Sequence, residues 1–258
     1  GNGGDGGGLS YDGAHISLTL CGDVFTGNKA NAAGGALFRV GYNSQGGDPS
    51  TVSIDRSTFD GNSVDVDAGN AAGLYLEDLT LTMTATTISN NTGHYGGGLW
   101  AGHNITANLT NVTIADNTAS GGGGIWFSDL TKGTFQNVTI AGNTGDGLFN
   151  GDTNTVLQDS IIANNVRGTL DSTTNCASAH GSNGANLQFP NDGKTSCTSD
   201  ITFGDPTLGP LADNGGPVKT MLPASGSAAI GKGVSCAATD ATGAIRPSAC
   251  TLGAVEAK

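Results

Sequence analysis

The sequence predicts an all-β protein: a right-handed parallel β-helix followed by a non-repetitive cap region that contains disulfides. A short motif, in which an apolar residue is followed three positions later by asparagine, recurs six times along the 258-residue chain. The six asparagines are Asn28, Asn62, Asn91, Asn117, Asn143 and Asn165. A motif that recurs every 22 to 34 residues is typical of a solenoid, in which each repeat buries its apolar face only against the next repeat.

Each coil contains apolar positions with the spacing of strands. In Leu79-Leu81-Met83 they alternate with polar residues, which places them on one face of a strand. A second strand follows a pair of small residues, as in Gly98-Leu99, where glycine permits the backbone to turn. Short parallel strands joined in this way predict a β-helix, and the chirality of parallel crossovers predicts that it is right-handed.

The asparagine column is expected to be structural. Stacked coils place one asparagine over the next at about 4.8 Å, so that the side-chain amides can form hydrogen bonds along the column. Asparagine also tolerates the left-handed backbone conformation of tight turns.

The composition limits the classes of partner. The chain has 44 glycines, 12% charged residues and a net charge of −12. Periodic apolar positions argue against disorder. A strongly acidic chain has few cations to neutralise phosphates, which excludes nucleic acid and anionic membrane surfaces as partners. The sequence has no run of about 18 apolar residues, so we expect no membrane insertion. A secreted or cell-surface protein fits these features.

The repeats divide the chain into two parts. Residues 1–165 are predicted to form the coils, and residues 166–258 to form a C-terminal cap region packed on the solenoid, because the end of a β-helix must be covered. Residues 1–8 are almost all glycine and offer no equivalent cover. The first coil is therefore a candidate surface for end-to-end self-association into filaments.

The five cysteines fall into two local pairs and one remainder. Cys176 and Cys197 bracket one loop and Cys236 and Cys250 another, which predicts two disulfides formed in an oxidising compartment. Cys21 is expected to be a small buried hydrophobic residue, or else to pair with a cysteine outside this sequence.

Two known families share these motifs. The Gly-Gly-apolar openings and the Phe/Ile-x-x-Asn closings resemble the repeats of polymorphic outer-membrane proteins. Residues 205–217, with Arg246-Pro247 and residues 250–256, resemble the signature of the choice-of-anchor Q domain family. The likeness covers about residues 90–256, and it departs at Ala241-Thr242, where that family usually has Gln-Arg. The resemblance implies a secreted or surface-displayed right-handed β-helix and supplies no reaction mechanism.

Aromatic residues follow the inward residue that opens each coil, so they are expected to point outward in one column. The column consists of Phe38, Tyr75, Trp100, Trp126 and Phe149. Exposed rings in a row suit stacking against sugar rings. Alternatively, the C-terminal region folds back and buries them, because a bare apolar stripe of this length is unusual for a soluble monomer.

A second column lies three residues beyond the aromatic one. It consists of Asp78, His103, Asp129 and Asp152. Carboxylates about 5 Å apart suit general acid–base catalysis, as in retaining glycosidases, and the same oxygens suit Ca²⁺. The simpler explanation is that these are solvated turn residues. The sequence implies no other cofactor or metal. A lyase needs a basic residue as well, and only Arg39 adjoins the aromatic column.

The sequence therefore favours a secreted or surface-exposed structural and binding protein, which self-associates or binds a glycan. The competing interpretations are a glycan-active enzyme, either a polysaccharide hydrolase or a lyase, and a non-catalytic carbohydrate-binding protein that uses the aromatic column. The sequence does not identify the ligand or decide whether the protein is an enzyme.

Overall fold

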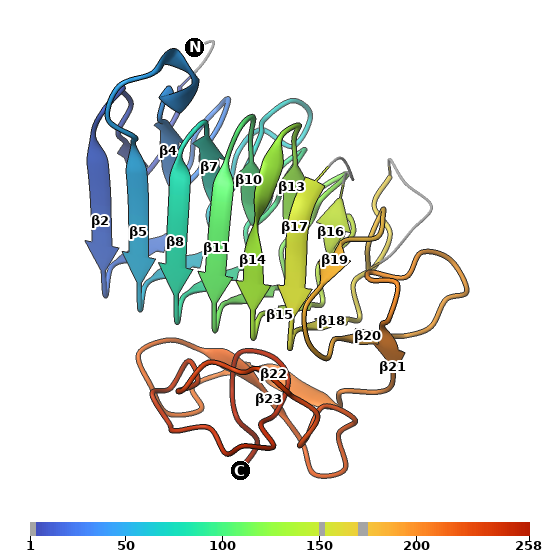
Figure 1. The fold of residues 1–258 in the computed structure, drawn as a ribbon. Helices are drawn as coiled ribbons and strands as arrows, with labels where there is room; N and C mark the ends of the chain where they lie inside the picture. Colours follow the sequence, from blue (N-terminus) through green and yellow to red (C-terminus); the bar gives the residue numbers. More distant parts are fainter. Residues whose placement is uncertain (1–3, 150–152, 170–174) are drawn as a thin grey trace.

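The computed structural model describes residues 4–149, 153–169 and 175–258, and it is a parallel β-helix (Figure 1). Three parallel sheets surround one apolar core, and each of the first six coils contributes one strand to each sheet. The predicted fold class is confirmed. None of the described residues forms a helix that is long and apolar enough to cross a membrane.

The three sheets are named here in the order in which the chain enters them. Sheet 1 contains β1 (Leu9–Ser10), β4 (Leu37–Val40), β7 (Leu74–Glu77), β10 (Leu99–Ala101), β13 (Ile125–Phe127) and β16 (Leu148–Phe149). Sheet 2 contains β2 (Ser17–Cys21), β5 (Thr51–Asp55), β8 (Thr80–Thr84), β11 (Thr106–Thr110), β14 (Thr131–Gln136), β17 (Thr153–Gln158) and β19 (Gly181–Ser182). Sheet 3 contains β3 (Val24–Thr26), β6 (Thr58–Asp60), β9 (Thr87–Ser89), β12 (Thr113–Ala115), β15 (Thr139–Ala141), β18 (Ile161–Ala163), β20 (Leu187–Phe189) and β21 (Thr202–Phe203).

The strands alternate between core and surface, as the sequence predicts. In β8 the side chains of Leu81 and Met83 are fully buried, whereas that of Thr82 between them is exposed. Pairing keeps equivalent positions in register, so that Leu109 of β11 lies beside Phe135 of β14. Apolar side chains therefore stack on apolar side chains along the axis of the coils.

Glycines precede the strands of sheet 1 because successive coils approach closely there. A Cβ atom added to Gly98 would lie 2.6 Å from the carbonyl oxygen of Gly124, and one added to Gly124 would lie 2.4 Å from that of Gly147. Any larger residue would have to displace the backbone of the next coil.

The asparagine column is a continuous hydrogen-bonded ladder inside the turn. The side-chain Nδ2 of Asn117 donates to Oδ1 of Asn143 at 3.0 Å and to the carbonyl oxygen of Ile88 at 3.0 Å. Its own Oδ1 accepts from the backbone nitrogen and from Nδ2 of Asn91, at 3.0 and 2.8 Å. Asn91, Asn117 and Asn143 are all fully buried, so these bonds satisfy polar groups that water cannot reach.

The solenoid extends further than the sequence predicts. Coil residues were expected to end at 165, but β19 pairs with β17 and β20 pairs with β18, both in parallel. β21 then pairs with β20. The Cys176–Cys197 disulfide belongs to the core at the C-terminal end of the solenoid, and both cysteines are buried. Residues 175–203 thus complete and cover the last coil.

The C-terminal region from residue 205 packs along one side of the coils (Figure 1). It contains an antiparallel hairpin of β22 (Leu208–Ala212) and β23 (Thr220–Pro223). The hydroxyl of Thr87 donates to the carbonyl oxygen of Lys219 at 2.6 Å, and the amide of Ala254 donates to Thr139 Oγ1 at 2.9 Å. These contacts cover Thr87 of β9 and Thr139 of β15, on the outer face of sheet 3.

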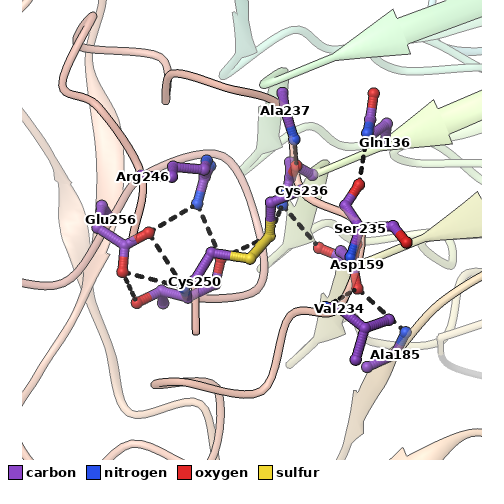
Figure 2. Close-up of a disulfide and its surroundings, with 12 residues drawn as sticks. Gln136, Asp159, Ala185, Val234, Ser235, Cys236, Ala237, Arg246, Cys250 and Glu256 are labelled. Carbon is purple, nitrogen blue, oxygen red and sulfur yellow. Dashed lines mark hydrogen bonds and ion pairs between the residues drawn. A yellow bond between two sulfur atoms is a disulfide. The ribbon is translucent and has the colours of Figure 1, made fainter. Parts of the chain in front are cut away.

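Figure 2 shows a buried carboxylate that joins this region to the coils. Asp159, at the end of β17, is fully buried, and its oxygens accept from the amides of Ala185, Val234 and Ser235 at 3.1, 3.0 and 2.8 Å. The Cys236–Cys250 disulfide lies directly beside it. Both predicted disulfides are therefore present.

Arg246 and Glu256, two residues of the C-terminal sequence motif, have a structural role. Arg246 is buried and its Nη1 lies 3.1 Å from Glu256 Oε2, while its Nη2 donates to Asn111 Oδ1 of the solenoid at 3.1 Å. The hydrogen bond to Asn111 therefore fastens the C-terminal region to a turn of the fourth coil, between β11 and β12. A buried arginine without such acceptors would be strongly destabilising.

The expectation that Cys21 is buried is wrong. Cys21 ends β2, at the outer edge of sheet 2, and its side chain is exposed. Its Sγ lies 3.8 Å from Asp55 Oδ2 and 3.3 Å from a guanidinium nitrogen of Arg56. The strand alternation that buries Leu20 turns the next residue outward.

We predict that Asn117→Leu destabilises the fold by about 3 kcal/mol, because it leaves buried donors of Asn91 and the carbonyl of Ile88 without partners. Urea unfolding followed by circular dichroism measures the change. Asn154→Leu is the matched control, since Asn154 is exposed on sheet 2, and we expect it to change stability by less than about 0.5 kcal/mol. Equal effects of the two changes would contradict the structural role of the ladder.

His180 makes stability depend on pH. The imidazole is buried, its ring centroid lies 5.3 Å from that of Phe127, and desolvation lowers its pKa from about 6.5 to about 4. Between these values the unfolded chain binds a proton that the folded chain does not. The contribution of His180 to the free energy of unfolding is therefore fully present above pH 6.5. It falls by about 3 kcal/mol as the pH drops toward 4.

We predict that His180→Gln removes this contribution from the pH dependence. Unfolding free energies of the two proteins at pH 7 and pH 4.5 measure it, and subtraction cancels the titration of other groups. The exposed His15 provides the control variant, His15→Gln. If both variants follow the wild-type curve, His180 is not the responsible group.

Candidate functional site

The five predicted aromatic residues form one stacked column on the outer face of sheet 1. Strand pairing places Phe38 beside Tyr75, Tyr75 beside Trp100, and Trp100 beside Trp126. The centroid separations from Phe38 to Phe149 are 5.1, 5.7, 5.3 and 4.3 Å, and neighbouring planes differ by 29° or less. We call this set the aromatic column.

The aromatic column is half-buried, and the C-terminal region does not cover it. All five side chains are partly exposed. The contacts of the described residues 205–258 with the coils are made near sheets 2 and 3 instead, for example at Thr87, Gln136 and Asp159. Part of their burial comes from one another, because neighbouring rings stack.

Stacking determines what the aromatic column can offer to a ligand. With its neighbours nearly parallel at 5.7 and 5.3 Å, Trp100 has both ring faces turned toward other rings. Stacked aromatic pairs contribute about 0.5–1.5 kcal/mol each. The column therefore stabilises the coils, and it presents mainly ring edges to solvent. A sugar would meet these edges and the polar groups beside them.

Sequence reasoning missed two neighbours of the column. Tyr95, in the turn before β10, packs against Trp126 with centroids 5.0 Å apart and against His94 at 4.0 Å. Glu77 accepts a hydrogen bond of 2.6 Å from the hydroxyl of Tyr75. Burial, followed by this carboxylate, raises the pKa of Tyr75. Period-2 alternation in β7 was the available signal, because it places residues 75 and 77 on one face.

Arg39 does not belong to this surface. It lies at an inward position of β4, is fully buried, and donates to the carbonyl oxygens of Gly13 and Ile16 at 2.7 and 3.0 Å. The guanidinium is thus hydrogen-bonded to backbone carbonyl oxygens of the first coil, and it cannot serve as a base beside the aromatic column.

The residues of the predicted acidic column differ in burial and in hydrogen-bond partners. Asp78 is 5% exposed, and its carboxylate accepts from the amide and hydroxyl of Ser44 and from Asn104 Nδ2, at 2.6 to 3.1 Å. Burial alone would raise the pKa of Asp78, but the hydrogen bonds from Ser44 and Asn104 outweigh it and lower the pKa. Asp78 therefore holds a turn together.

His103 and Asp129 form a close pair among the described residues of this column. Nδ1 of His103 lies 2.9 Å from Asp129 Oδ2, and both side chains are exposed to solvent. The hydrogen bond from His103, followed by that from Ser128, lowers the pKa of Asp129. Asp152 lies outside the described residues.

Among the described members of this column, no two carboxylates are paired with each other. The oxygens of Asp78 are taken by Ser44 and Asn104, and Asp129 is paired with a histidine rather than with a second acid. Within residues 4–149, 153–169 and 175–258, no three acidic, histidine or cysteine side chains gather closely enough to hold a metal ion. Ca²⁺ at this column stays a prediction.

Two of the hollows among the described residues lie where the segments 213–219 and 239–243 meet the coils. One, of 260 Å³, is lined by hydroxyls of Thr58, Thr87 and Ser89 with Asp60, Asp213 and Lys219. The other, of 380 Å³, includes Asp55, Arg56 and Asp240. None of the residues predicted from the sequence to form a site lines either one.

We predict that the same substitution lowers the thermal stability at one aspartate and leaves it unchanged at another. Asp78→Asn loses a charged acceptor inside a buried turn and should destabilise the fold by about 1–3 kcal/mol. Asp129→Asn, at an exposed site, should leave the thermal midpoint unchanged within error. Thermal unfolding followed by circular dichroism tests both. An unchanged midpoint for Asp78→Asn would remove the structural role assigned to this residue.

Comparison with known proteins identifies a family. No curated protein and no solved structure is significantly similar to this chain. A family model described as the right-handed β-helix region matches residues 42–192, a range that runs from just after β4 in the second coil to just past β20. The match extends over more than half of the sequence, and the structure has the parallel coils that it implies. The chain thus belongs to the right-handed β-helix family.

Proposed function

We propose that this protein is a secreted or surface-exposed structural and binding scaffold whose contact surface is the outer face of sheet 1. The observation that carries the proposal is the aromatic column: five partly exposed rings, in register over five coils, that the described C-terminal region leaves uncovered. A surface of this kind, bordered by Glu77 and Tyr95, is typical of recognition rather than of a closed catalytic pocket.

The two disulfides support an oxidising location. Cys176–Cys197 is buried in the end of the core, and Cys236–Cys250 fastens the C-terminal region beside Asp159. Disulfides persist in extracellular compartments and are rare in the cytosol. The low charge and the glycine-rich coils fit the same setting.

The residues of the acidic column do not favour a hydrolase or lyase. Asp78 is engaged in holding a turn, and Arg39 is buried against backbone carbonyls of the first coil. Of the column residues that the structure describes, His103 and Asp129 are paired near the surface. General acid–base catalysis on a glycosidic bond needs two groups placed on either side of it. A binding function asks for no such pair.

A specific observation favours a carbohydrate as one ligand. The edges of Trp100 and Trp126 lie in one row with the Tyr75 hydroxyl, which is hydrogen-bonded to Glu77. Apolar edges beside oriented acceptors suit a sugar chain laid along the coils, because sugars present both C–H groups and hydroxyls. This non-catalytic carbohydrate-binding function is the second candidate.

A glycan array, combined with an assay for new reducing ends and unsaturated uronates, tests these proposals. We expect binding without turnover, and at least an about tenfold loss of affinity in Trp100→Ala and in Trp126→Ala. Phe203→Ala is the control, because Phe203 is exposed but lies away from the aromatic column on β21.

The outcomes separate the candidates. Turnover by the wild-type protein would overturn the scaffold proposal in favour of an enzyme. Glycan binding that survives both tryptophan substitutions would mean that the aromatic column is not the contact. Absence of glycan binding would remove the carbohydrate candidate and leave protein partners for the scaffold.

A further inference from the structure

Carboxylates lie along the aromatic column where the strands of sheet 1 end. Glu77 is the last residue of β7, two residues after Tyr75 and therefore on the same face of the sheet. A Cβ atom added to Gly102, just after β10 in the next coil, would lie 2.9 Å from both Cβ and Cγ of Glu77. The glutamate side chain therefore lies beside Gly102, next to the aromatic column, and it is partly exposed.

Two further carboxylates continue this border in both directions along the coils. Asp12, in the first coil, accepts a hydrogen bond of 3.0 Å from the hydroxyl of Tyr42. Asp129, in the fifth coil, lies 2.9 Å from His103 Nδ1. The side chains of Asp12 and Asp129 are 40% and 60% exposed. We call Asp12, Glu77 and Asp129 the carboxylate border.

Most of the groups that hold this border are uncharged. The hydroxyls of Tyr42 and Tyr75 donate to Asp12 and Glu77. Arg39 is the only basic residue in the described strands of sheet 1, and its buried guanidinium approaches one member of the border, Asp12, at 4.0 Å. The surface beside the aromatic column is therefore negatively charged.

Two tyrosines on this face respond to the negative charge. The hydrogen bond to Asp12 raises the pKa of Tyr42, and burial and the charges of Asp12 and Glu77 raise it further. Burial, followed by Glu77 and then by the charge of Asp5, raises the pKa of Tyr75. A phenol holds its proton more tightly where negative charge surrounds it. An anionic ligand, such as a chain of uronates, would be repelled by the same carboxylates.

The ring edges and the carboxylate border suit different groups of one ligand. Both faces of Trp100 are turned toward neighbouring rings, so a cation cannot lie over them and must be met by a carboxylate. The edge of an aromatic ring carries a partial positive charge, which suits oxygen atoms. A sugar unit that bears an ammonium group presents both, with oxygens for the edges and a cation for the border.

A stiff sugar chain fits this face better than a cationic peptide does. Equivalent positions of successive coils recur at about 4.8 Å along the aromatic column, so a ligand laid along it meets similar groups repeatedly. Each lysine or arginine of a peptide would lose rotamer entropy when its charge is fixed. An amine attached directly to a sugar ring has no side-chain torsion of this kind to lose.

We propose that the outer face of sheet 1 binds a linear polysaccharide of amino sugars with free amines, laid along the aromatic column with its ammonium groups at Asp12, Glu77 and Asp129. This inference rests on the carbohydrate-binding function proposed above, and it names the class of ligand. Glycans that carry carboxylate or sulfate groups are disfavoured at the same surface.

Isothermal titration calorimetry with three oligomers of equal length tests the proposal. The oligomers are β-1,4-linked glucosamine with free amines, its fully N-acetylated form, and galacturonate. We expect the free-amine oligomer to bind at least about tenfold more tightly than the N-acetylated one at low salt, because several charge pairs act together. The advantage should shrink as the salt concentration rises.

A variant that carries both Glu77→Gln and Asp129→Asn removes two charges but keeps the oxygen atoms that accept from Tyr75 and His103. It should lose most of the preference for the free amine and still bind the N-acetylated oligomer. The matched control carries Asp205→Asn and Asp213→Asn, two exposed aspartates of the C-terminal region. This control changes the net charge equally and should keep the preference.

The outcomes separate this inference from the function on which it rests. Equal affinity for the two glucosamine oligomers, lost in Trp100→Ala, would overturn the inference and leave carbohydrate binding standing. Tighter binding of galacturonate would overturn it as well. Absence of binding by all three oligomers would overturn both proposals, and binding of oligolysine in that case would indicate a cationic protein partner instead.

Discussion

The structure depends on strict vertical stacking of the coils, and the asparagine ladder enforces it. A strand pair alone tolerates a slip along its length, but an amide that must reach both the next Oδ1 and a carbonyl oxygen of the coil before it does not. The buried bonds of Asn91, Asn117 and Asn143 therefore fix the register of every coil. Both the apolar core and the aromatic column follow from that register.

Features with a fixed spacing from the ladder could be predicted from the sequence. The apolar stack lies at a constant distance before each asparagine, as Leu109 does from Asn117 and Phe135 from Asn143. The aromatic residues have no fixed distance from the asparagines, but each follows directly after the apolar residue that opens its coil. The constant pairing of Leu99, Trp100 and Ala101 with Ile125, Trp126 and Phe127 illustrates this. The two disulfides were also predictable, because each closes a short loop.

Features that depend on contacts between distant segments could not be predicted. The acidic column lies in turns of unequal length, so its members share a spacing from the strands but not an environment: Ser44 of a different loop reaches Asp78 and buries it. Cys21 was assigned to the core, although strand alternation around Leu20 argued otherwise. The last coil was missed because its asparagine, Asn175, comes only ten residues after Asn165.

The near-parallel indoles of Trp100 and Trp126, with an interplanar angle of 3° and centroids 5.3 Å apart, have an optical consequence. Two identical chromophores this close share their electronic excitation, and Tyr75 next to them can pass its own excitation on to the pair. Ultraviolet light absorbed at several coils is thus emitted from one place. The intrinsic fluorescence of this protein reports on the integrity of the central coils as a group, without any attached dye.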